Sequence, residues 1–452
     1  MRLRKTITTI VATAILLAGW QLFAVIANQP ELIPSLPRLV RTLCEWLVSG
    51  SFYQSVGATI LRGIFGMSIS FVCAIGMAGL FARFEWVYEL FRPLLAIMRS
   101  IPVISFILLA LIFLNPESIP LMIAFLTMFP LLTENLTRGI LDLRPGLSIM
   151  ARQFHIKCSN VLFQIIYPQL KPFLYSGLAS AAGFGWRAII MGEVLSQCAF
   201  GIGSEMKRAQ NFIAVPELLA WTIVAVFISF FFDKGISKVA DITPKISFAN
   251  EDQTTPTPTL SVLDTKDISY QYGIQHFSHS FQKGIIYGIS APSGKGKTTL
   301  LNLIGGILLP TEGEIHPTRH FGIATIFQQP QLLPYLTAEE NIILPLSSFL
   351  TEEKARRIAQ KHLQEMEMEP FGNRYPKELS YGQQQRIAIA RALAYPSPLL
   401  LMDEPFKGLD EALSHRIIER IREMQMKEER IILFTSHNPD EIRLLADEVI
   451  YL

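Results

Sequence analysis

A series of apolar runs in the first 240 residues constrains the fold of this chain more than any other feature. The runs cover residues 6–27, 64–82, 94–114, 119–132, 173–195 and 218–232. Most of them approach the about 20 residues that a helix needs to cross the hydrocarbon core of a bilayer. The whole chain is 50% hydrophobic and only 17% charged, which is too apolar for an ordinary globular protein. Residues 1–240 are therefore predicted to form an all-α domain of six transmembrane helices.

Two of these runs allow other interpretations. Residues 1–27 have the basic start and the apolar stretch of a cleaved signal peptide. A permanent span is favoured because the run is long and contains Trp20. The fourth run is interrupted by Pro120 and Pro130, so its helix is expected to be tilted and extended toward Leu136.

Basic residues set the orientation of the predicted spans. Three precede the first run, and five lie between the fourth and fifth runs: Arg138, Arg144, Arg152, Lys157 and Lys171. Lysine and arginine are enriched in cytoplasmic loops, so both groups are placed on the cytoplasmic side. Six spans, or five without a signal peptide, then return the chain to the cytoplasm for its second half. We expect a multi-pass membrane protein with its second half in the cytoplasm.

The composition changes after the last apolar run. Residues 241–260 are rich in Thr and Pro and are predicted to be a flexible linker that packs into no core. In residues 261–452, short apolar runs alternate with stretches rich in Glu, Lys and Arg, which indicates an α/β domain with a mostly parallel sheet. The four cysteines all lie in the first half without CxxC spacing, so neither a zinc site nor a disulfide framework is expected.

A glycine-rich loop in the second domain has the features of a phosphate-binding loop. It follows the apolar run GIIYGIS, read as a buried strand, and precedes TTLLNLIGGIL, read as a helix. Gly294 and Gly296 let backbone N–H groups approach phosphates at the positive end of the helix dipole. Lys297 is expected to reach the β- and γ-phosphates, and the Thr298 hydroxyl is expected to bind Mg²⁺. The loop residues expected to surround the nucleotide are Ser293, Gly294, Lys295, Gly296, Lys297, Thr298 and Thr299.

Further stretches, in a fixed order, select one class of nucleotide-binding protein. They are IFQQPQLLPYLT with Gln328, LSYGQQQRIAIARA from Leu379, LLLMDEP ending at Pro405, EPFKGLD with Asp410, and TSH ending at His437. Together these stretches resemble the Q-loop, signature, Walker B strand, D-loop and switch histidine of ATP-binding cassette (ABC) proteins. Any one of these residues alone has an ordinary structural explanation, but their joint order does not. The resemblance implies a P-loop nucleoside triphosphatase fold and binding of ATP with Mg²⁺.

The resemblance assigns a role to each residue, and the chemistry of phosphoryl transfer supports these roles. Hydrolysis of the γ-phosphate depends mainly on positioning and charge stabilisation. Asp403 is expected to hold Mg²⁺ through water, with Thr298 and Gln328 as further metal contacts, and Glu404 to act as general base. His437 is implied to contact the γ-phosphate, and Gln328 to sense the metal and the attacking water. Tyr272 is implied to stack on adenine, with Tyr270 as the alternative. The other implied nucleotide contacts lie around the signature and the D-loop and are Ser380, Gly382, Gln383 and Asp410. Tyr381 stands where the family more often has Gly.

The first half resembles the importer permeases of the nitrate, sulfonate, taurine and thiamine-precursor group. The stretches that carry this are LIPSLPRLV, RPLLAIMRSIPV, ARQFHIKCSNVLFQIIYPQLKP and GWRAIIMGEVL. The resemblance implies that residues 151–168 form a coupling element beside the Q-loop. Here the chain differs from the family, with Ile149 and Met150 in place of Glu and Ala, and His155 in place of Gly.

Together these features predict ATP-driven uptake of a small solute by a permease fused to its ATPase. The family closes its cassettes as head-to-tail pairs, so a homodimer is expected, together with a separate extracytoplasmic substrate-binding protein, contact with membrane lipid, and no nucleic acid. Two alternatives are a half-size exporter and a non-transporting machine that transmits force to an outer partner. Arg187 and Glu193 lie within the fifth run. Arg187 is interpreted either as part of an anion path or, like Glu193, as a residue that lies near a membrane edge or pairs with another helix.

Overall fold

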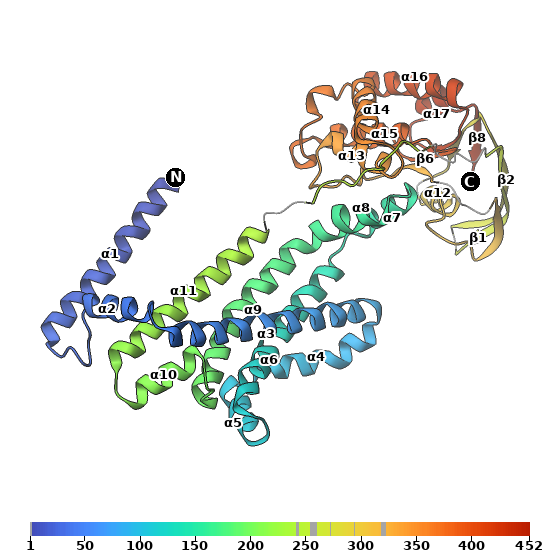
Figure 1. Cartoon of the computed structure of the whole chain (residues 1–452). Helices are drawn as coiled ribbons and strands as arrows, with labels where there is room; N and C mark the ends of the chain where they lie inside the picture. Colours follow the sequence, from blue (N-terminus) through green and yellow to red (C-terminus); the bar gives the residue numbers. More distant parts are fainter. Residues whose placement is uncertain (1, 241–243, 254–259, 272, 293, 318–321) are drawn as a thin grey trace. The chain divides into compact units, whose positions relative to one another are not determined.

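The computed structural model of the chain describes residues 2–240, 244–253, 260–271, 273–292, 294–317 and 322–452 (Figure 1). Its contacts divide the chain into two compact units. One consists of Met1–Leu143 with Gln169–Ile242, and the other of Arg144–Pro168 with Thr243–Leu452. The second unit is therefore discontinuous in sequence, because residues 144–168 group with the C-terminal half and not with the helices on either side of them.

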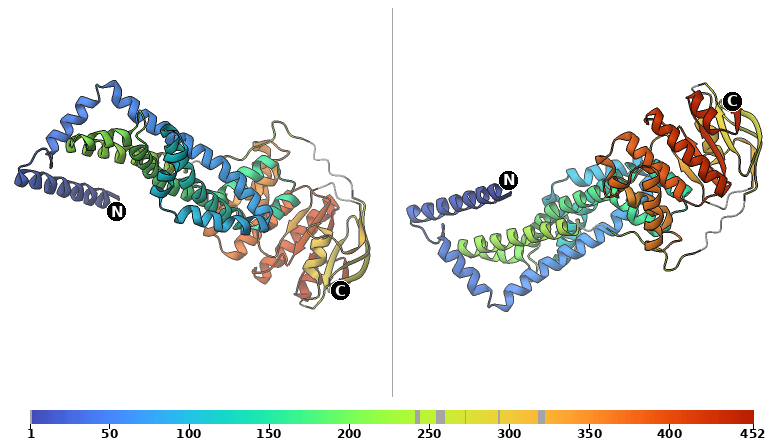
Figure 2. Two further views of the ribbon diagram at one scale, coloured as in Figure 1. Left: turned by 90° about the horizontal axis from the view of Figure 1, so that it is seen from below. Right: turned by 90° about the horizontal axis from the view of Figure 1, so that it is seen from above.

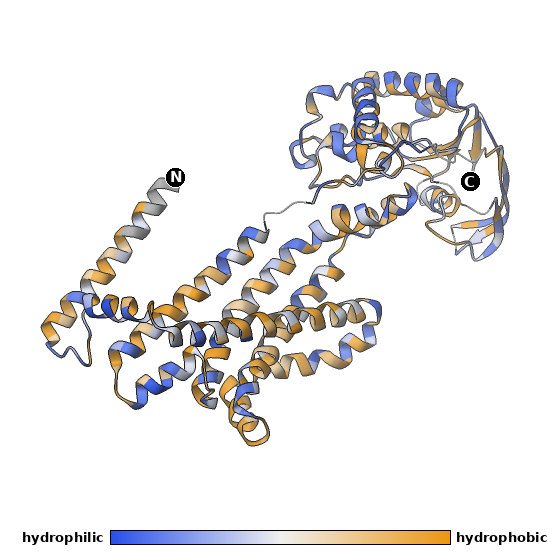
Figure 3. Ribbon diagram, in the orientation of Figure 1, coloured by the Kyte–Doolittle hydropathy of each residue, from blue (hydrophilic) through white to orange (hydrophobic). Residues whose placement is uncertain are grey.

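The first unit is helical, and apolar residues cover most of its helices (Figure 3). Its helices are α1 (Arg2–Ala27), α2 (Leu36–Trp46), α3 (Gly50–Arg83), α4 (Glu85–Ser100), α5 (Val103–Phe113), α6 (Ile119–Leu141), α9 (Tyr167–Ser196), α10 (Ile202–Asn211) and α11 (Val215–Ala240), with the short 3₁₀ turn η1 (Pro116–Ser118) before α6. Four stretches of helix among the described residues are long and apolar enough to cross a membrane: 50–83, 116–141, 158–196 and 215–236. The apolar part of α1, Val11–Ala27, is shorter. The six-span count stays a prediction.

The third predicted span is not one straight helix. Its residues belong to α4 and α5, which meet at an angle of 94°. The break falls at Ile101-Pro102, where Ile101 is extended. Proline disfavours the helical conformation of the residue before it, which accounts for the position of the bend. The predicted extension of the fourth span is confirmed, since α6 continues past Leu136 to Leu141 with Pro120 in its first turn.

Small residues allow the long helices of this unit to approach closely. Helices α3, α6, α9 and α11 lie side by side (Figures 1 and 2). A Cβ atom added to Gly66 on α3 would come within 2.6 Å of the Cβ of Ala124 on α6. Small residues at helix contacts are typical of membrane bundles, where close van der Waals packing replaces the hydrophobic driving force.

The two charged residues of the fifth predicted span have different surroundings. Glu193 is 0% exposed and accepts hydrogen bonds from Thr59 Oγ1 at 2.9 Å, Arg62 Nη1 at 2.7 Å and the backbone N–H of Gly203 at 2.9 Å. This supports the interpretation that Glu193 pairs with other helices. The side chain of Arg187 is exposed and makes no ion pair or hydrogen bond with any other residue that the structure describes.

The second unit contains two sheets. The five-stranded sheet has the order β5-β6-β7-β3-β8 and every adjacent pair is parallel, as predicted. Its strands are β3 (Ile286–Ser290), β5 (Ala324–Ile326), β6 (Leu399–Asp403), β7 (Ile431–Thr435) and β8 (Glu448–Tyr451). The second sheet is antiparallel, has the order β2-β1-β4, and consists of β1 (Val262–Tyr270), β2 (Ile274–Gln282) and β4 (Glu312–His316).

Helices complete the second unit. They are α12 (Lys297–Ile304), α13 (Ala338–Leu346), α14 (Glu352–Glu365), α15 (Tyr381–Ala394), α16 (Glu411–Glu428) and α17 (Pro439–Leu445). Strands β6 and β7 are buried at every position, which is typical of strands covered by helices on both faces of a parallel sheet. The C-terminal edge of this sheet positions the candidate site.

The segment of residues 144–168, called the coupling segment below, is built into this second unit. It consists of α7 (Pro145–Gln153), α8 (Cys158–Asn160) and a π-helical turn (Val161–Ile166). Met150, Phe154 and Ile165 are buried in the same hydrophobic core as β5, α13 and α15. His155, which replaces the usual Gly, has a φ of 48°, in the left-handed region that glycine enters without steric cost.

Part of the predicted linker is ordered along the second unit. Ile246 and Phe248 pack against its hydrophobic core, and Ala249 and Gln253 make backbone hydrogen bonds to Ser347 and Phe349. The expectation that residues 241–260 pack into no core is therefore wrong for residues 244–253. Apolar residues at 246 and 248 alternate with polar ones at 245 and 247, so one face of an extended chain is apolar.

Candidate functional site

The glycine-rich loop connects β3 to α12, as the sequence predicts. Gly294 and Gly296 have φ angles of 81° and 91°, and a Cβ on Gly296 would come within 2.7 Å of the carbonyl oxygen of Gly273. Only glycine fits this position. Lys297 begins α12, and its Nζ donates to the Ala291 carbonyl at 2.7 Å, so the side chain folds back over the loop. Lys295 and Thr299 lie in the loop and in the first turn of α12. Ser293 and Tyr272 lie outside the described residues.

Asp403, the last residue of β6, forms a hydrogen bond with Thr298 in the first turn of α12. Its carboxylate accepts a hydrogen bond from Thr298 Oγ1 at 2.9 Å and another from Thr435 Oγ1 at 2.8 Å. Burial raises the pKa of Asp403 above its ordinary value, although the two hydroxyls and the charge of Lys297 act against this. The arrangement places a hydroxyl and a carboxylate together beside the glycine-rich loop.

These two groups decide whether a metal ion fits the site. Among the described residues, no group of three or more His, Cys, Asp or Glu side chains is arranged to hold a metal. Mg²⁺, however, usually takes only one or two protein oxygens and completes its shell with water and phosphate. Thr298 and Asp403 supply such oxygens 2.9 Å apart, so they fit Mg²⁺ bound together with a nucleotide.

Glu404 follows directly, and three polar side chains surround its carboxylate. Lys407 Nζ lies 3.0 Å and His437 Nε2 lies 3.1 Å from its oxygens, and Gln328 hydrogen-bonds to it. Burial acts to raise the pKa of Glu404, but the bonds from Lys407 and Gln328 and the charge of Lys407 outweigh burial and lower it. Glu404 is therefore ionised at neutral pH. The backbone of Glu404 is left-handed, with a φ of 49°, a strained conformation of the kind that clusters at functional sites.

The predicted signature stretch begins α15. Ser380 caps this helix, and the backbone N–H of Ser380 donates to Gln383 Oε1 at 2.9 Å. A Cβ on Gly382 would come within 2.6 Å of the Gly408 carbonyl oxygen, so this glycine allows a close approach to the stretch before Asp410. Asp410 caps α16 in turn. Within the described part of the chain, Ser380, Gly382 and Gln383 make no hydrogen bond to the glycine-rich loop.

Arg391, at the other end of α15, links the Q-loop to the coupling segment. It is 1% exposed and donates to the carbonyls of Gln331 at 2.9 Å and Pro330 at 3.0 Å. Its guanidinium carbon lies 5.4 Å from the centre of the Phe154 ring, which belongs to the coupling segment. Burial lowers the pKa of Arg391 to about 9, so the residue is charged at neutral pH in a buried site.

Comparison with known proteins places both halves of the chain. Residues 274–407 match the family described as ABC transporter, and residues 66–233 match the family described as binding-protein-dependent transport system inner membrane component. An uncharacterized ABC transporter ATP-binding protein of Methanocaldococcus jannaschii is 34% identical over 201 residues, which cover 40% of this chain and 85% of that protein. The chain belongs to the ABC transporter family. Its ABC ATPase domain binds and hydrolyses ATP, and a helical membrane domain precedes it.

Other relatives of the ABC ATPase domain are import proteins by name. An Fe(3+) ions import ATP-binding protein of Rhizobium etli is 35% identical over 189 residues, and a glucose import ATP-binding protein of Saccharolobus solfataricus is 35% identical over 185 residues. They match 40% and 38% of this chain, and the chain spans only about half of their length, 54% and 52%. A solved dimeric ATP-binding cassette in a post-hydrolysis state with ADP and Pi is 32% identical, with a TM-score of 0.40 over 42% of this chain and 94% of that one.

Three residues that contact the predicted site were not identified from the sequence. Lys407 lies three residues after Glu404. This i, i+3 spacing would have indicated that the two side chains can form an ion pair. Thr435 holds Asp403 from the neighbouring strand, which only the strand order reveals. In the sequence, Arg391 resembles an ordinary surface cation of a helix. Only the structure shows that it is buried and donates a hydrogen bond to the Gln331 carbonyl.

Proposed function

We propose that the chain is one half of an ATP-driven importer, in which two copies and a separate extracytoplasmic substrate-binding protein move a small solute across a prokaryotic cytoplasmic membrane. The observation that carries this proposal is the coupling segment. It lies between two helices of the membrane domain in sequence, yet its Phe154 and Ile165 are buried in the core of the ATPase unit. A segment shared in this way transmits movement of the cassette to the membrane helices.

The proposed ATP site uses the residues that the structure brings together. The loop from Gly294 to Thr299, with Ser293 and Tyr272, holds the nucleotide, and Lys297 leaves the Ala291 carbonyl to reach its phosphates. Thr298, Asp403 and Gln328 would hold Mg²⁺, which would supply positive charge to the phosphates. Glu404, kept ionised by its neighbours, accepts the proton of the attacking water, and His437 orients the γ-phosphate.

Two observations support a pair of chains as the working unit. Ser380, Gly382, Gln383 and Asp410 make no described hydrogen bond to the glycine-rich loop of their own chain, as expected if they complete the ATP site of a second copy. Arg187 is exposed on α9, within a predicted span. A charged side chain at membrane depth almost always faces an interior, a partner or water rather than lipid, so this face of α9 favours a second copy beside it.

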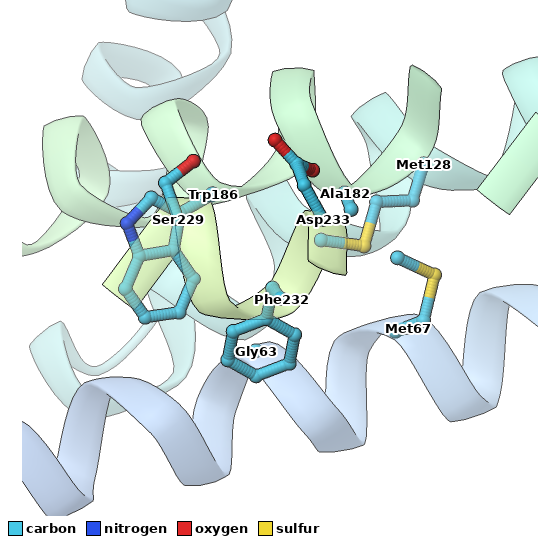
Figure 4. A pocket seen from close by; sticks show the side chains of 8 residues that line it. All are labelled: Gly63, Met67, Met128, Ala182, Trp186, Ser229, Phe232 and Asp233. Carbon is cyan, nitrogen blue, oxygen red and sulfur yellow. The ribbon is translucent and has the colours of Figure 1, made fainter. Parts of the chain in front are cut away.

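One small cavity of the membrane domain lies among α3, α6, α9 and α11. It is lined by Gly63, Met67, Met128, Ala182, Trp186, Ser229, Phe232 and Asp233 (Figure 4). Its volume is about 20 Å³, which holds no more than one water molecule. This cavity is too small to carry a solute.

Import is favoured over the half-size exporter by the match of residues 66–233 to a binding-protein-dependent inner membrane component and by the import relatives of the cassette. The short connection between α3 and α4, a single residue, also differs from the long cytoplasmic extensions expected of exporters. A force-transmitting machine would be expected to carry a large outer domain, and the segments before α3 and between α9 and α11 are short.

The direction of transport can be tested in inside-out membrane vesicles, where added ATP reaches the cassette directly. The candidate binding protein is loaded with labelled solute and enclosed in the vesicle, where it supplies the substrate. An importer empties the vesicle of labelled solute when ATP is added, and the Lys297→Ala variant does not. ATP-driven filling of the vesicle would instead identify an exporter, and ATP hydrolysis without movement in either direction would favour the force-transmitting machine.

A further inference from the structure

The ordered part of the linker, residues 244–253, is called the strap below. It lies between the two family matches, which end at residue 233 and begin at residue 274, so neither assigns it a role. The strap is extended and forms no helix or strand. It contacts the coupling segment on one side and the ATPase domain on the other, all within the second unit.

The contact with the coupling segment centres on Asn160. Its Oδ1 accepts from the backbone N–H of Ser247 at 2.8 Å, and its Nδ2 donates to the Ser247 carbonyl at 2.8 Å. The same Nδ2 donates to Ser347 Oγ at 2.8 Å, and Asn160 is 1% exposed. One buried amide therefore satisfies both backbone groups of a strap residue and connects them to the cassette. Gln164 adds a hydrogen bond from Nε2 to the Pro244 carbonyl at 3.0 Å.

The contact with the ATPase domain continues along the strap. The N–H of Ala249 donates to the Ser347 carbonyl at 3.1 Å. The carboxylate of Asp252 accepts from the N–H of Thr351 at 2.9 Å and from its hydroxyl at 3.0 Å, at the N-terminus of α14. The Phe248 side chain packs against the core that also buries the coupling segment. Hydrogen bonds therefore fix the strap to the cassette at both Ala249 and Asp252.

We propose that the strap holds the coupling segment on the cassette of its own chain. The coupling segment, the cassette and the strap then form one joint contact. The contacts described above attach the strap to both the coupling segment and the cassette. The importance of this attachment for transport rests on the proposed function. Residues 241–243 separate the end of α11 from the strap, and an extended chain of that length spans at most about 14 Å. The tether between membrane helix and cassette is therefore far shorter than a flexible linker of 20 residues.

The proposal is tested by disulfide crosslinking of the coupling segment to the cassette in native membranes. The background chain has its four cysteines replaced by serine and carries Lys157→Cys with Ser348→Cys, a pair joined in the structure by the Lys157 N–H and Ser348 Oγ at 3.0 Å. Ser247→Pro removes the backbone N–H that donates to Asn160 Oδ1. Ser247→Ala keeps this N–H and serves as the matched control. We expect Ser247→Pro to lower the crosslinking rate about tenfold, as for a lost hydrogen bond whose acceptor stays unpaired, and Ser247→Ala to leave it unchanged.

Insertions provide a second comparison that does not depend on proline. One residue inserted after Ser247 shifts the apolar and polar faces of the strap beyond that point. One residue inserted after Thr255 lengthens the chain equally without moving the strap. ATP binding to each purified variant shows whether the cassette is folded. Equal crosslinking in the two insertion variants, or in Ser247→Pro and Ser247→Ala, would overturn the proposal.

Pairing within one chain is tested with two differently tagged chains, one carrying Lys157→Cys and the other Ser348→Cys. We expect crosslinks when both cysteines lie on one chain and none between the two tagged chains. Efficient crosslinking between chains would show that the coupling segment docks on the partner's cassette and would contradict the proposal. These readouts need no solute and no direction of transport, so failure of the import proposal leaves them interpretable.

Discussion

Glu404 combines a strained backbone, an ionised carboxylate and contacts with Lys407, Gln328 and His437 in one residue. If it is the general base, Glu404→Gln keeps the shape of the site but removes the proton acceptor. We expect ATP hydrolysis to fall by about 10²- to 10⁴-fold with ATP binding retained, since general base catalysis contributes this much. Steady-state hydrolysis and equilibrium nucleotide binding measure the two effects. Glu419→Gln, an exposed position on α16, is the control, and equal turnover in both variants would remove Glu404 from the mechanism.

Tyr381 illustrates what a departure from the family pattern means at the scale of one residue. Its hydroxyl donates to the Gln328 carbonyl at 2.7 Å, and its ring lies against Gly408. The residue that replaces the commoner Gly therefore ties the signature to the Q-loop within one chain. The sequence identified the substitution but not this contact, because 53 residues separate the two partners.

The helix α15 connects the signature at its start with Arg391 near its end, and Arg391 meets Phe154 of the coupling segment. We expect Phe154→Leu and Arg391→Met each to destabilise the purified chain toward heat. Their combined cost should be smaller than the sum by about 1 to 2 kcal/mol, the value of a desolvated cation–π contact. Thermal unfolding of the two single variants and the double variant gives this coupling energy.

The control for that cycle is Phe349→Leu. Phe349 contacts Tyr395 in the same core but has no ring contact with Arg391 among the described residues. Its cost should add to that of Arg391→Met. Additive costs for Phe154 and Arg391 as well would show that the two side chains are neighbours without an energetic link.

Which elements the sequence predicted depends on how each one is buried. The parallel strands were predicted because both of their faces are covered, which leaves short continuous apolar runs such as Leu399–Asp403. The antiparallel sheet was missed because strands such as β1 are buried at only some positions, without regular alternation. The bend at Pro102 and the strap depend on single residues within longer stretches, and the Asn160 partner of the strap lies 87 residues earlier in the chain. The glycine-rich loop, Asp403 and Glu404 stood out in the sequence because each follows an apolar run, and the structure confirms that these runs are the strands β3 and β6. Their roles in ATP hydrolysis stay predictions.

The whole molecule is expected to work as a homodimer whose ATP sites each use two chains. Chains with Lys297→Ala and chains with Ser380→Arg should each be inactive alone. Mixed dimers have one site in which Lys297 and Ser380 are both intact, so co-assembly should restore hydrolysis well above either parent. ATPase activity of dimers purified through two different tags measures this. Activity in a monomer, or no recovery in mixed dimers, would contradict the shared site.

The discontinuity of the second unit has a consequence for how the protein is made. Residues 144–168 leave the ribosome before α9 and α11, and their core partners in α13 and α15 are synthesised later. Met150, Phe154 and Ile156 therefore lack their packing partners in α13 and α15 while the remaining membrane helices insert. The core of the second unit can form only where residues 144–168 and the C-terminal half lie on the same side of the bilayer. We expect a chain in which only one of α9 and α11 has inserted to hold these pieces on opposite sides of the bilayer, so that the core cannot form.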